Sequence, residues 1–206
     1  MNKQVLKLGA RILENLPDMS PAVLQSWIDN PRGLKKFLTG LNPPENWERG
    51  VKDTTHLRFL QSATLAPTKG IVTLAQASDV FTGHIDPCFK LWRKNVADVD
   101  TKEALVNVYE MKQSGTFAEL FRSVSKDVRS LCLTQGQIKE FPRTHPHLLQ
   151  QDGYCTFFLF EVNDALLVAY VSVFGGMLEV RMRPYPDYHV WHNGDRHRLV
   201  VPQRTV

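Results

Sequence analysis

The chain has 206 residues, of which 43% are hydrophobic and 22% are charged, so it is long enough for one large domain or a domain with a small module. Its net charge of +4 is compatible with nucleic-acid binding but does not by itself indicate it. No apolar stretch approaches the ~20 residues of a membrane span, and the N-terminus lacks the apolar core of a signal peptide. A cytoplasmic protein without a membrane partner is therefore expected.

Residues 1–45 are expected to form a module of three short helices. Ser20-Pro21 and Asn30-Pro31 each combine a capping residue with a following proline, which is typical of a helix start. Apolar residues recur at helical spacing, and basic residues lie on the polar faces. These basic faces leave two interpretations open, DNA binding by the three helices or a solvated docking module. A proline-rich linker then leads into an α+β domain, residues 46–206.

The middle of the chain mixes strand and helix signals. Leu57–Leu65 and Ile71–Leu74 flank a turn and are expected to form a hairpin, and Ala104–Met111 is expected to be a buried strand. Thr116 and Thr134 each precede a Glu or Gln by three residues, the pattern of a helix capping box. The middle therefore predicts a strand followed by at least two helices.

The C-terminal part, residues 153–201, predicts an antiparallel sheet. Runs rich in aromatic and β-branched residues are joined by two-residue linkers whose residues tolerate the positive φ of hairpin turns. The runs and their linkers are Tyr154–Val162, Asn163-Asp164, Ala165–Phe174, Gly175-Gly176 and Met177–Arg183.

The two turns predict one common inward face. In their registers Phe158 faces Ala169 and Val171 faces Val180, and side chains alternate between the two sides of a strand. The predicted core face consists of Phe158, Phe160, Val162, Leu167, Ala169, Val171, Val173, Leu178, Val180 and Met182. The other face is polar except at one end, where a covering helix is expected.

A last hairpin is expected around Asn193-Gly194, a strong hairpin signal, between strands Tyr188–His192 and Asp195–Val201. In this register Trp191 faces Arg196 and His189 faces Arg198, so all four residues fall on the same side. One face of the hairpin then carries a histidine, a tryptophan and two arginines.

This face is the candidate ligand-binding surface. Its residues, with two arginines of the neighbouring strand, are His189, Trp191, Arg196, Arg198, Arg181 and Arg183. An aromatic ring beside arginines can stack a nucleobase and hold phosphate, and a histidine can act as a general acid. The alternative is structural, with the tryptophan shielding the core edge while arginines lie over it.

No metal, cofactor or catalytic residue is expected. In the predicted register His189 points away from His192 and His197, so at most two would converge where zinc needs three or four ligands. The cysteines are widely spaced without a CxxC pair, which is typical of reduced core thiols. They are Cys88, Cys132 and Cys155. Phosphate-binding glycine motifs are absent from the sequence.

Several longer segments carry a resemblance. They are Ile12–Leu34, Asp79–Trp92, Val108–Phe121, Leu131–Ile138, Asp152–Phe160 and Arg196–Gln203. Together they resemble a group of uncharacterised bacterial proteins, which implies a bacterial, cytoplasmic protein and transfers no functional residue. The order of strand, helices and antiparallel sheet is also similar in architecture to RelE-type ribonuclease toxins, whose sheet binds RNA through Arg, Lys, His and Tyr. The present chain is longer and less basic than those toxins.

The expected fold is α+β, an N-terminal three-helix module followed by a mixed domain that ends in an antiparallel β-meander. The first functional hypothesis is a non-enzymatic binding or interaction protein with a protein or nucleic-acid partner. One alternative is an RNA-acting protein, a RelE-like ribonuclease or an RNA binder, that uses the Arg/His/Trp face. Another is DNA binding through the N-terminal helices.

Overall fold

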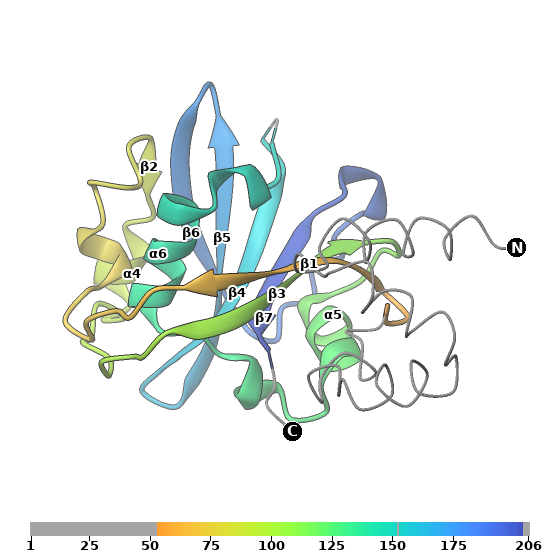
Figure 1. Ribbon diagram of the computed structural model, residues 1–206, viewed down its shortest axis with the longest axis horizontal. Helices are drawn as coiled ribbons and strands as arrows, with labels where there is room; N and C mark the ends of the chain where they lie inside the picture. The colour runs from red at the N-terminus through yellow and green to blue at the C-terminus, as the bar shows by residue number, and fades with distance from the viewer. Residues whose placement is uncertain (1–52, 152, 204–206) are drawn as a thin grey trace, which may run out of the picture. The chain divides into compact units, whose positions relative to one another are not determined.

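A computed structural model describes residues 53–151 and 153–203, and the predicted helical module of residues 1–45 lies outside them. The described chain forms a seven-stranded sheet with the order β1-β3-β7-β4-β5-β6-β2 (Figure 1). The strands are β1 (Leu57–Leu65), β2 (His84–Ile85), β3 (Ala104–Met111), β4 (Cys155–Val162), β5 (Ala165–Phe174), β6 (Met177–Pro184) and β7 (Arg198–Pro202). The α-helices are α4 (Cys88–Leu91), α5 (Phe117–Val124) and α6 (Gln135–Thr144). The 3-10 helices are η1 (Leu74–Gln76), η2 (Val128–Leu131), η3 (Pro146–Leu148) and η4 (Asn193–Asp195).

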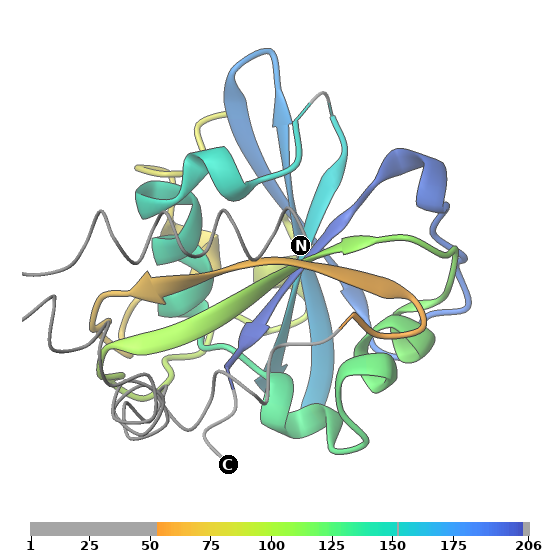
Figure 2. The same ribbon diagram turned by 45° about the vertical axis from the view of Figure 1, so that its right-hand side comes forward.

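The sheet is mixed. Four neighbouring strand pairs are antiparallel, whereas β7 runs parallel to β4 and β2 runs parallel to β6. The sheet twists strongly, so that β1 and β3 cross the direction of β5 and β6 in both ribbon views (Figures 1 and 2). β1 and the two-residue β2 form its two edges.

The predicted fold class is wrong: the described residues do not form a mixed domain that ends in a separate antiparallel meander, and no N-terminal three-helix module is shown among them. One mixed sheet gathers strands from the whole described range, and these residues contain three α-helices, of 4, 8 and 10 residues. The physical reason is that an alternating pattern predicts which face of a strand is buried but not which distant strand it pairs with. Pairing between strands far apart in sequence, as in β3/β7, therefore escaped the prediction.

The two local hairpins are confirmed. Phe158 pairs with Ala169 and Val171 pairs with Val180, as predicted. Both turns use left-handed backbone, with φ of 52° and 60° at Asn163-Asp164 and of 56° and 77° at Gly175-Gly176. Positive φ at both central residues is what a tight hairpin turn requires, so local chemistry sets these two registers.

The predicted hairpin at Asn193-Gly194 is wrong. Asn193–Asp195 is the 3-10 helix η4, and the left-handed residue is Arg196 with φ of 49°. β7 then pairs with β3 and β4 rather than with the segment before the turn. In that segment Trp191 forms an isolated bridge with Gly115.

The middle of the chain was predicted in part. Ala104–Met111 is a strand as expected, and both capping boxes are present at the starts of α5 and α6. The expected hairpin between Leu57–Leu65 and Ile71–Leu74 is wrong, because β1 pairs with β3 and Leu74 begins a 3-10 helix.

Each face of the sheet carries its own core. The first core contains the predicted inward face of β4–β6 together with Phe89 of α4 and Phe141 of α6. The second core contains Phe117 and Phe121 of α5 packed on the opposite face, with Trp191. Figure 2 shows α6 and α5 on opposite sides of the sheet. Burial on both faces explains why β4 reads as a nearly continuous apolar run.

Candidate ligand-binding site

Trp191 is the centre of an aromatic cluster in the second core. Its side chain is only 9% exposed, and its ring centroid lies 4.6 Å from that of Phe157 and 5.3 Å from that of Phe117. Two backbone hydrogen bonds hold the residue in place: Trp191 N donates to Gly115 O at 2.9 Å, and Gly115 N donates to Trp191 O at 3.1 Å. The indole therefore packs as core and does not offer an open face for a stacked base.

Arg183 covers the outer side of this cluster. Its guanidinium carbon lies 6.0 Å from the Trp191 ring centroid, and its Nη1 donates to Asp187 Oδ2 at 2.9 Å. The Asp187 carboxylate is the main cause that raises the pKa of Arg183, and its second oxygen accepts from His189 N at 3.2 Å. His189 also packs edge-on against Trp191 at 4.8 Å between centroids. The Arg183–Asp187 ion pair and the His189 ring thus form a lid over the tryptophan.

A hollow of about 330 Å³ opens beside this lid, at the end of the β5–β6 hairpin. Its lining residues are Gly153, Cys155, Tyr170, Ser172, Phe174, Glu179 and Arg181. Arg181 Nη2 donates to Glu179 Oε2 at 3.1 Å, so the positive charge in the wall is paired. Burial raises the pKa of the Tyr170 phenol above its ordinary value, against the opposing effect of Arg183.

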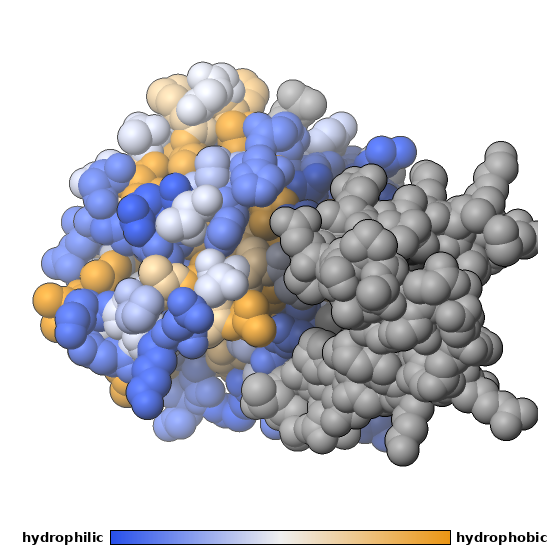
Figure 3. All heavy atoms as spheres, viewed as in Figure 1, coloured by the Kyte–Doolittle hydropathy of each residue, from blue (hydrophilic) through white to orange (hydrophobic). Residues whose placement is uncertain are grey.

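Exposed apolar side chains stand at the turn end of the hollow. Phe174, which lines the hollow, is 66% exposed, and Met177, its pairing partner across the turn, is 47% exposed. Figure 3 shows apolar atoms at the top of the view, where the hairpin ends. The surface therefore combines a polar, charge-paired wall with apolar anchors.

The structure brings together three of the six predicted residues, because Arg183 and His189 both lie against Trp191. Arg181 lies on the same side of β6 as Arg183 but pairs with Glu179. Arg198 does not join them, because it pairs with Thr156 on the side of the first core and its Nη1 donates to Leu149 O at 3.0 Å. Burial lowers the pKa of Arg198.

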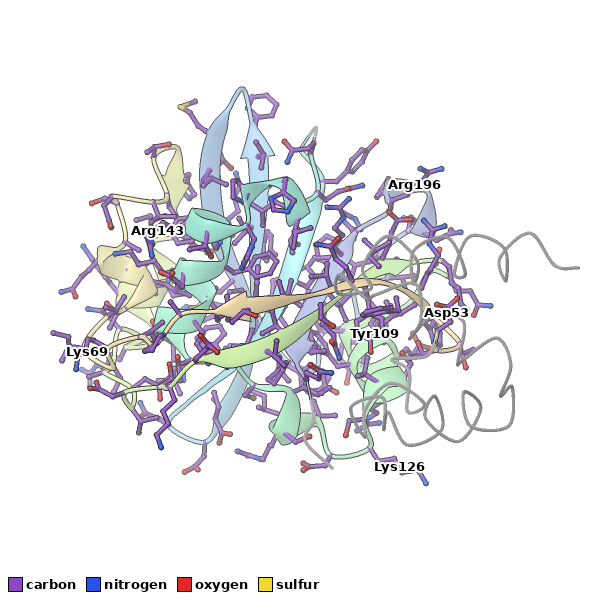
Figure 4. All side chains as sticks on the ribbon, viewed as in Figure 1. Asp53, Lys69, Tyr109, Lys126, Arg143 and Arg196 are labelled. Carbon is purple, nitrogen blue, oxygen red and sulfur yellow. The ribbon has the colours of Figure 1, made fainter. Side chains whose placement is uncertain are left out.

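Arg196 is exposed at the end of η4. Figure 4 shows it at the opposite end of the described region from Lys69 and Arg143. The shared hairpin face predicted for Trp191, Arg196 and Arg198 is therefore not formed.

Sequence reasoning weighed His197 only as a zinc ligand and missed its buried position. It is 4% exposed; its Nδ1 accepts from Cys155 N at 3.0 Å, and its Nε2 lies 3.3 Å from Asp195 Oδ2. Burial lowers its pKa, against the opposing effect of Asp195. These contacts fit a neutral ring with its proton on Nε2. The alternation of His197 with Leu199 and Val201 on one side of a strand was the available signal.

Two half-buried thiols of the described chain, one of which lines the hollow, are poor nucleophiles. Burial raises the pKa of Cys155 to about 12 and that of Cys132 to about 11, so both are protonated at neutral pH. All three cysteines of the described chain are unpaired. Within residues 53–151 and 153–203, no three His, Cys, Asp or Glu side chains group closely enough to hold a metal ion.

None of the helices in the described part of the chain is long and apolar enough to cross a membrane.

Comparison with known proteins finds no matching protein-family model, curated protein or solved structure.

Proposed function

We propose that the protein is a non-enzymatic binding protein that recognises a segment of another protein through the hollow beside the β5–β6 hairpin. The observation that carries this proposal is the composition of the surface. Its arginines are paired with carboxylates, Arg181 with Glu179 and Arg183 with Asp187, while apolar side chains stand exposed at its rim.

The apolar rim supports a peptide ligand. Protein interfaces concentrate their binding energy in a few aromatic or apolar anchors surrounded by polar groups. Phe174 and Met177 stand on either side of the Gly175-Gly176 turn and are exposed without a covering helix among the described residues. A hollow of about 330 Å³ beside them has the size of a pocket for one or two side chains.

The paired charges distinguish a protein ligand from RNA. Phosphate backbones bind surfaces with unpaired cations, because affinity arises from the release of counterions. Here Arg181 and Arg183 carry two positive charges and Glu179 and Asp187 carry two negative ones, so the local balance is zero. The Trp191 ring, which was expected to stack a base, is buried and offers no free face for stacking.

The test is a selection of random displayed peptides against the full chain, followed by titration of the enriched peptides. We expect Phe174→Ser to weaken their binding about tenfold or more, since a central aromatic anchor is lost. Ile71→Ser is the matched control, because Ile71 is equally apolar and 78% exposed but does not line the hollow. Its variant should bind like the wild type.

Two outcomes would overturn the proposal. One is a selection whose enriched peptides bind the Phe174→Ser and Ile71→Ser variants alike. The other is saturable binding of mixed-sequence single-stranded RNA that falls steeply with salt and is lost in Arg181→Ala, which would assign the surface to RNA instead.

A further inference from the structure

A second hollow, of about 580 Å³, lies at the other end of β5, at the Asn163-Asp164 turn. Its walls are mainly apolar and include Trp92, Leu166 and Tyr185. Three charged residues also line it: Lys94, Arg129 and Asp164. This combination of apolar walls with a few charged groups is typical of small-molecule sites.

The residues after α4 are held firmly beside this hollow. Arg93 is left-handed with φ of 52°, its N donates to Lys90 O at 3.0 Å, and Lys94 N donates to Phe89 O at 2.9 Å. This is the hydrogen-bond pattern of a Schellman helix end. The buried amide of Gln135 then donates to Lys94 O at 3.2 Å and to Val96 O at 3.1 Å. Trp92 and Lys94 are thus placed on a fixed backbone.

Of the three charged residues that line the hollow, only Arg129 has partners among the described residues. The Arg129 guanidinium bonds to Glu161 and donates to Asp164 O at 3.2 Å, so its charge is used within the protein. The Lys94 ammonium and the Asp164 carboxylate form no ion pair or side-chain hydrogen bond with the described residues, including each other. Among the described residues, one cation and one anion without a protein partner therefore line the same apolar-walled hollow.

We propose that this hollow binds the zwitterion of a free aromatic α-amino acid. The ligand carboxylate meets Lys94, its ammonium meets Asp164, and its ring packs against Trp92, which is 45% exposed, and the neighbouring Tyr185. Lys94 is half-buried and Asp164 is exposed, so a ligand with both charges gains two charge-assisted contacts, whereas a ligand with one charge gains only one. Aromatic rings gain further from edge or offset contacts with Trp and Tyr.

The experiment is ligand-observed NMR titration of the full chain with L-tryptophan, tryptamine and indole-3-propionate. We expect saturable binding of tryptophan, roughly millimolar for so small a ligand, and about fivefold to tenfold weaker binding of each one-charge analogue. Lys94→Met should weaken tryptophan to the level of tryptamine and leave tryptamine unchanged. Asp164→Asn keeps the left-handed turn, because Asn tolerates positive φ. It should weaken tryptophan binding to the level of indole-3-propionate and leave the binding of indole-3-propionate unchanged.

Lys90→Met is the matched control, because Lys90 lies on α4 but does not line the hollow, and it should bind tryptophan like the wild type. Lys94→Arg should restore most of the affinity. Three outcomes would each overturn the proposal. The first is equal binding of all three ligands, and the second is no binding up to the solubility limit of tryptophan. The third is unchanged tryptophan affinity in Lys94→Met and Asp164→Asn variants that keep the wild-type melting temperature. The peptide selection concerns the opposite end of β5, so the two tests fail independently.

Discussion

A single buried imidazole connects three parts of the described chain. His197 accepts a hydrogen bond from the backbone of β4 at Cys155, faces Asp195 of η4, and packs its ring 5.0 Å from Trp191 between centroids. A protonated ring would carry a proton on Nδ1, where the Cys155 N–H already points. Folding therefore favours the neutral form of the ring.

This preference predicts a pH dependence of stability. The pKa of His197 is lower in the folded chain than its ordinary value of 6.5, so below about pH 6.5 the unfolded chain binds a proton that the folded chain does not. The free energy of unfolding should be constant with respect to this group above that pH and decrease as the pH falls towards the folded pKa, by at most about 1.4 kcal/mol per pH unit.

Urea unfolding between pH 8 and pH 5 measures this effect, and His197→Gln removes it while keeping groups that accept and donate hydrogen bonds. The variant should show a shallower decrease of unfolding free energy than the wild type across that range. Asp195 and His189 also face the ring, so Asp195→Asn should steepen the decrease by removing the opposing carboxylate. Parallel curves for wild type and His197→Gln would contradict the assignment.

At the scale of elements, the first residue of α6 joins three segments of the chain through side-chain hydrogen bonds. The Gln135 side chain is fully buried; its Oε1 accepts from Leu74 N at 3.0 Å, while its Nε2 donates to the carbonyls of Lys94 and Val96. One amide thus joins α6, η1 and the loop after α4. The Thr134 capping box was readable from sequence because its partners lie three residues apart, whereas the bonds of Gln135 span 39–61 residues and left no local pattern.

Gln135→Leu should destabilise the protein by about 2–4 kcal/mol, because one buried and two part-buried backbone hydrogen bonds are lost at once. Urea or thermal unfolding measures this loss. Gln61→Leu is the control, since Gln61 is exposed on β1 and its side chain makes no hydrogen bond with the described residues, and it should change stability by less than about 0.5 kcal/mol. Equal effects of the two substitutions would show that Gln135 does not join these three segments.

At the scale of the whole described molecule, local and distant pairing explain what sequence reasoning found. The β4–β5–β6 hairpins follow from their own turns, and their inward face was identified correctly. The strongest turn signal, Asn193-Gly194, failed because the strand before it has no core face of its own: Tyr188 is 96% exposed, and Trp191 is drawn to Gly115 and the aromatic cluster. A turn-forming sequence produces a hairpin only where both flanking segments can pair as strands.

The position of β7 gives a prediction for the complete sheet. β7 separates β1-β3 from β4-β5-β6-β2 and contributes Leu199 and Val201 to one core and Val200 to the other. Deleting residues 198–206 should abolish cooperative unfolding in urea, whereas deleting residues 204–206, which leaves all seven strands, should preserve it. If the chain without residues 198–206 still unfolds cooperatively, and its free energy of unfolding depends on urea as steeply as that of the wild type, this prediction is wrong.

β7 lies between β3 and β4 in the sheet, and the ribosome synthesises it after the other six described strands. During translation, β3 and β4 each keep an unsatisfied row of backbone donors and acceptors until that strand arrives, and such rows invite pairing with other nascent chains. Slow synthesis or a pause shortly before the codon of Arg198 should therefore increase insoluble product and the demand for chaperones during expression.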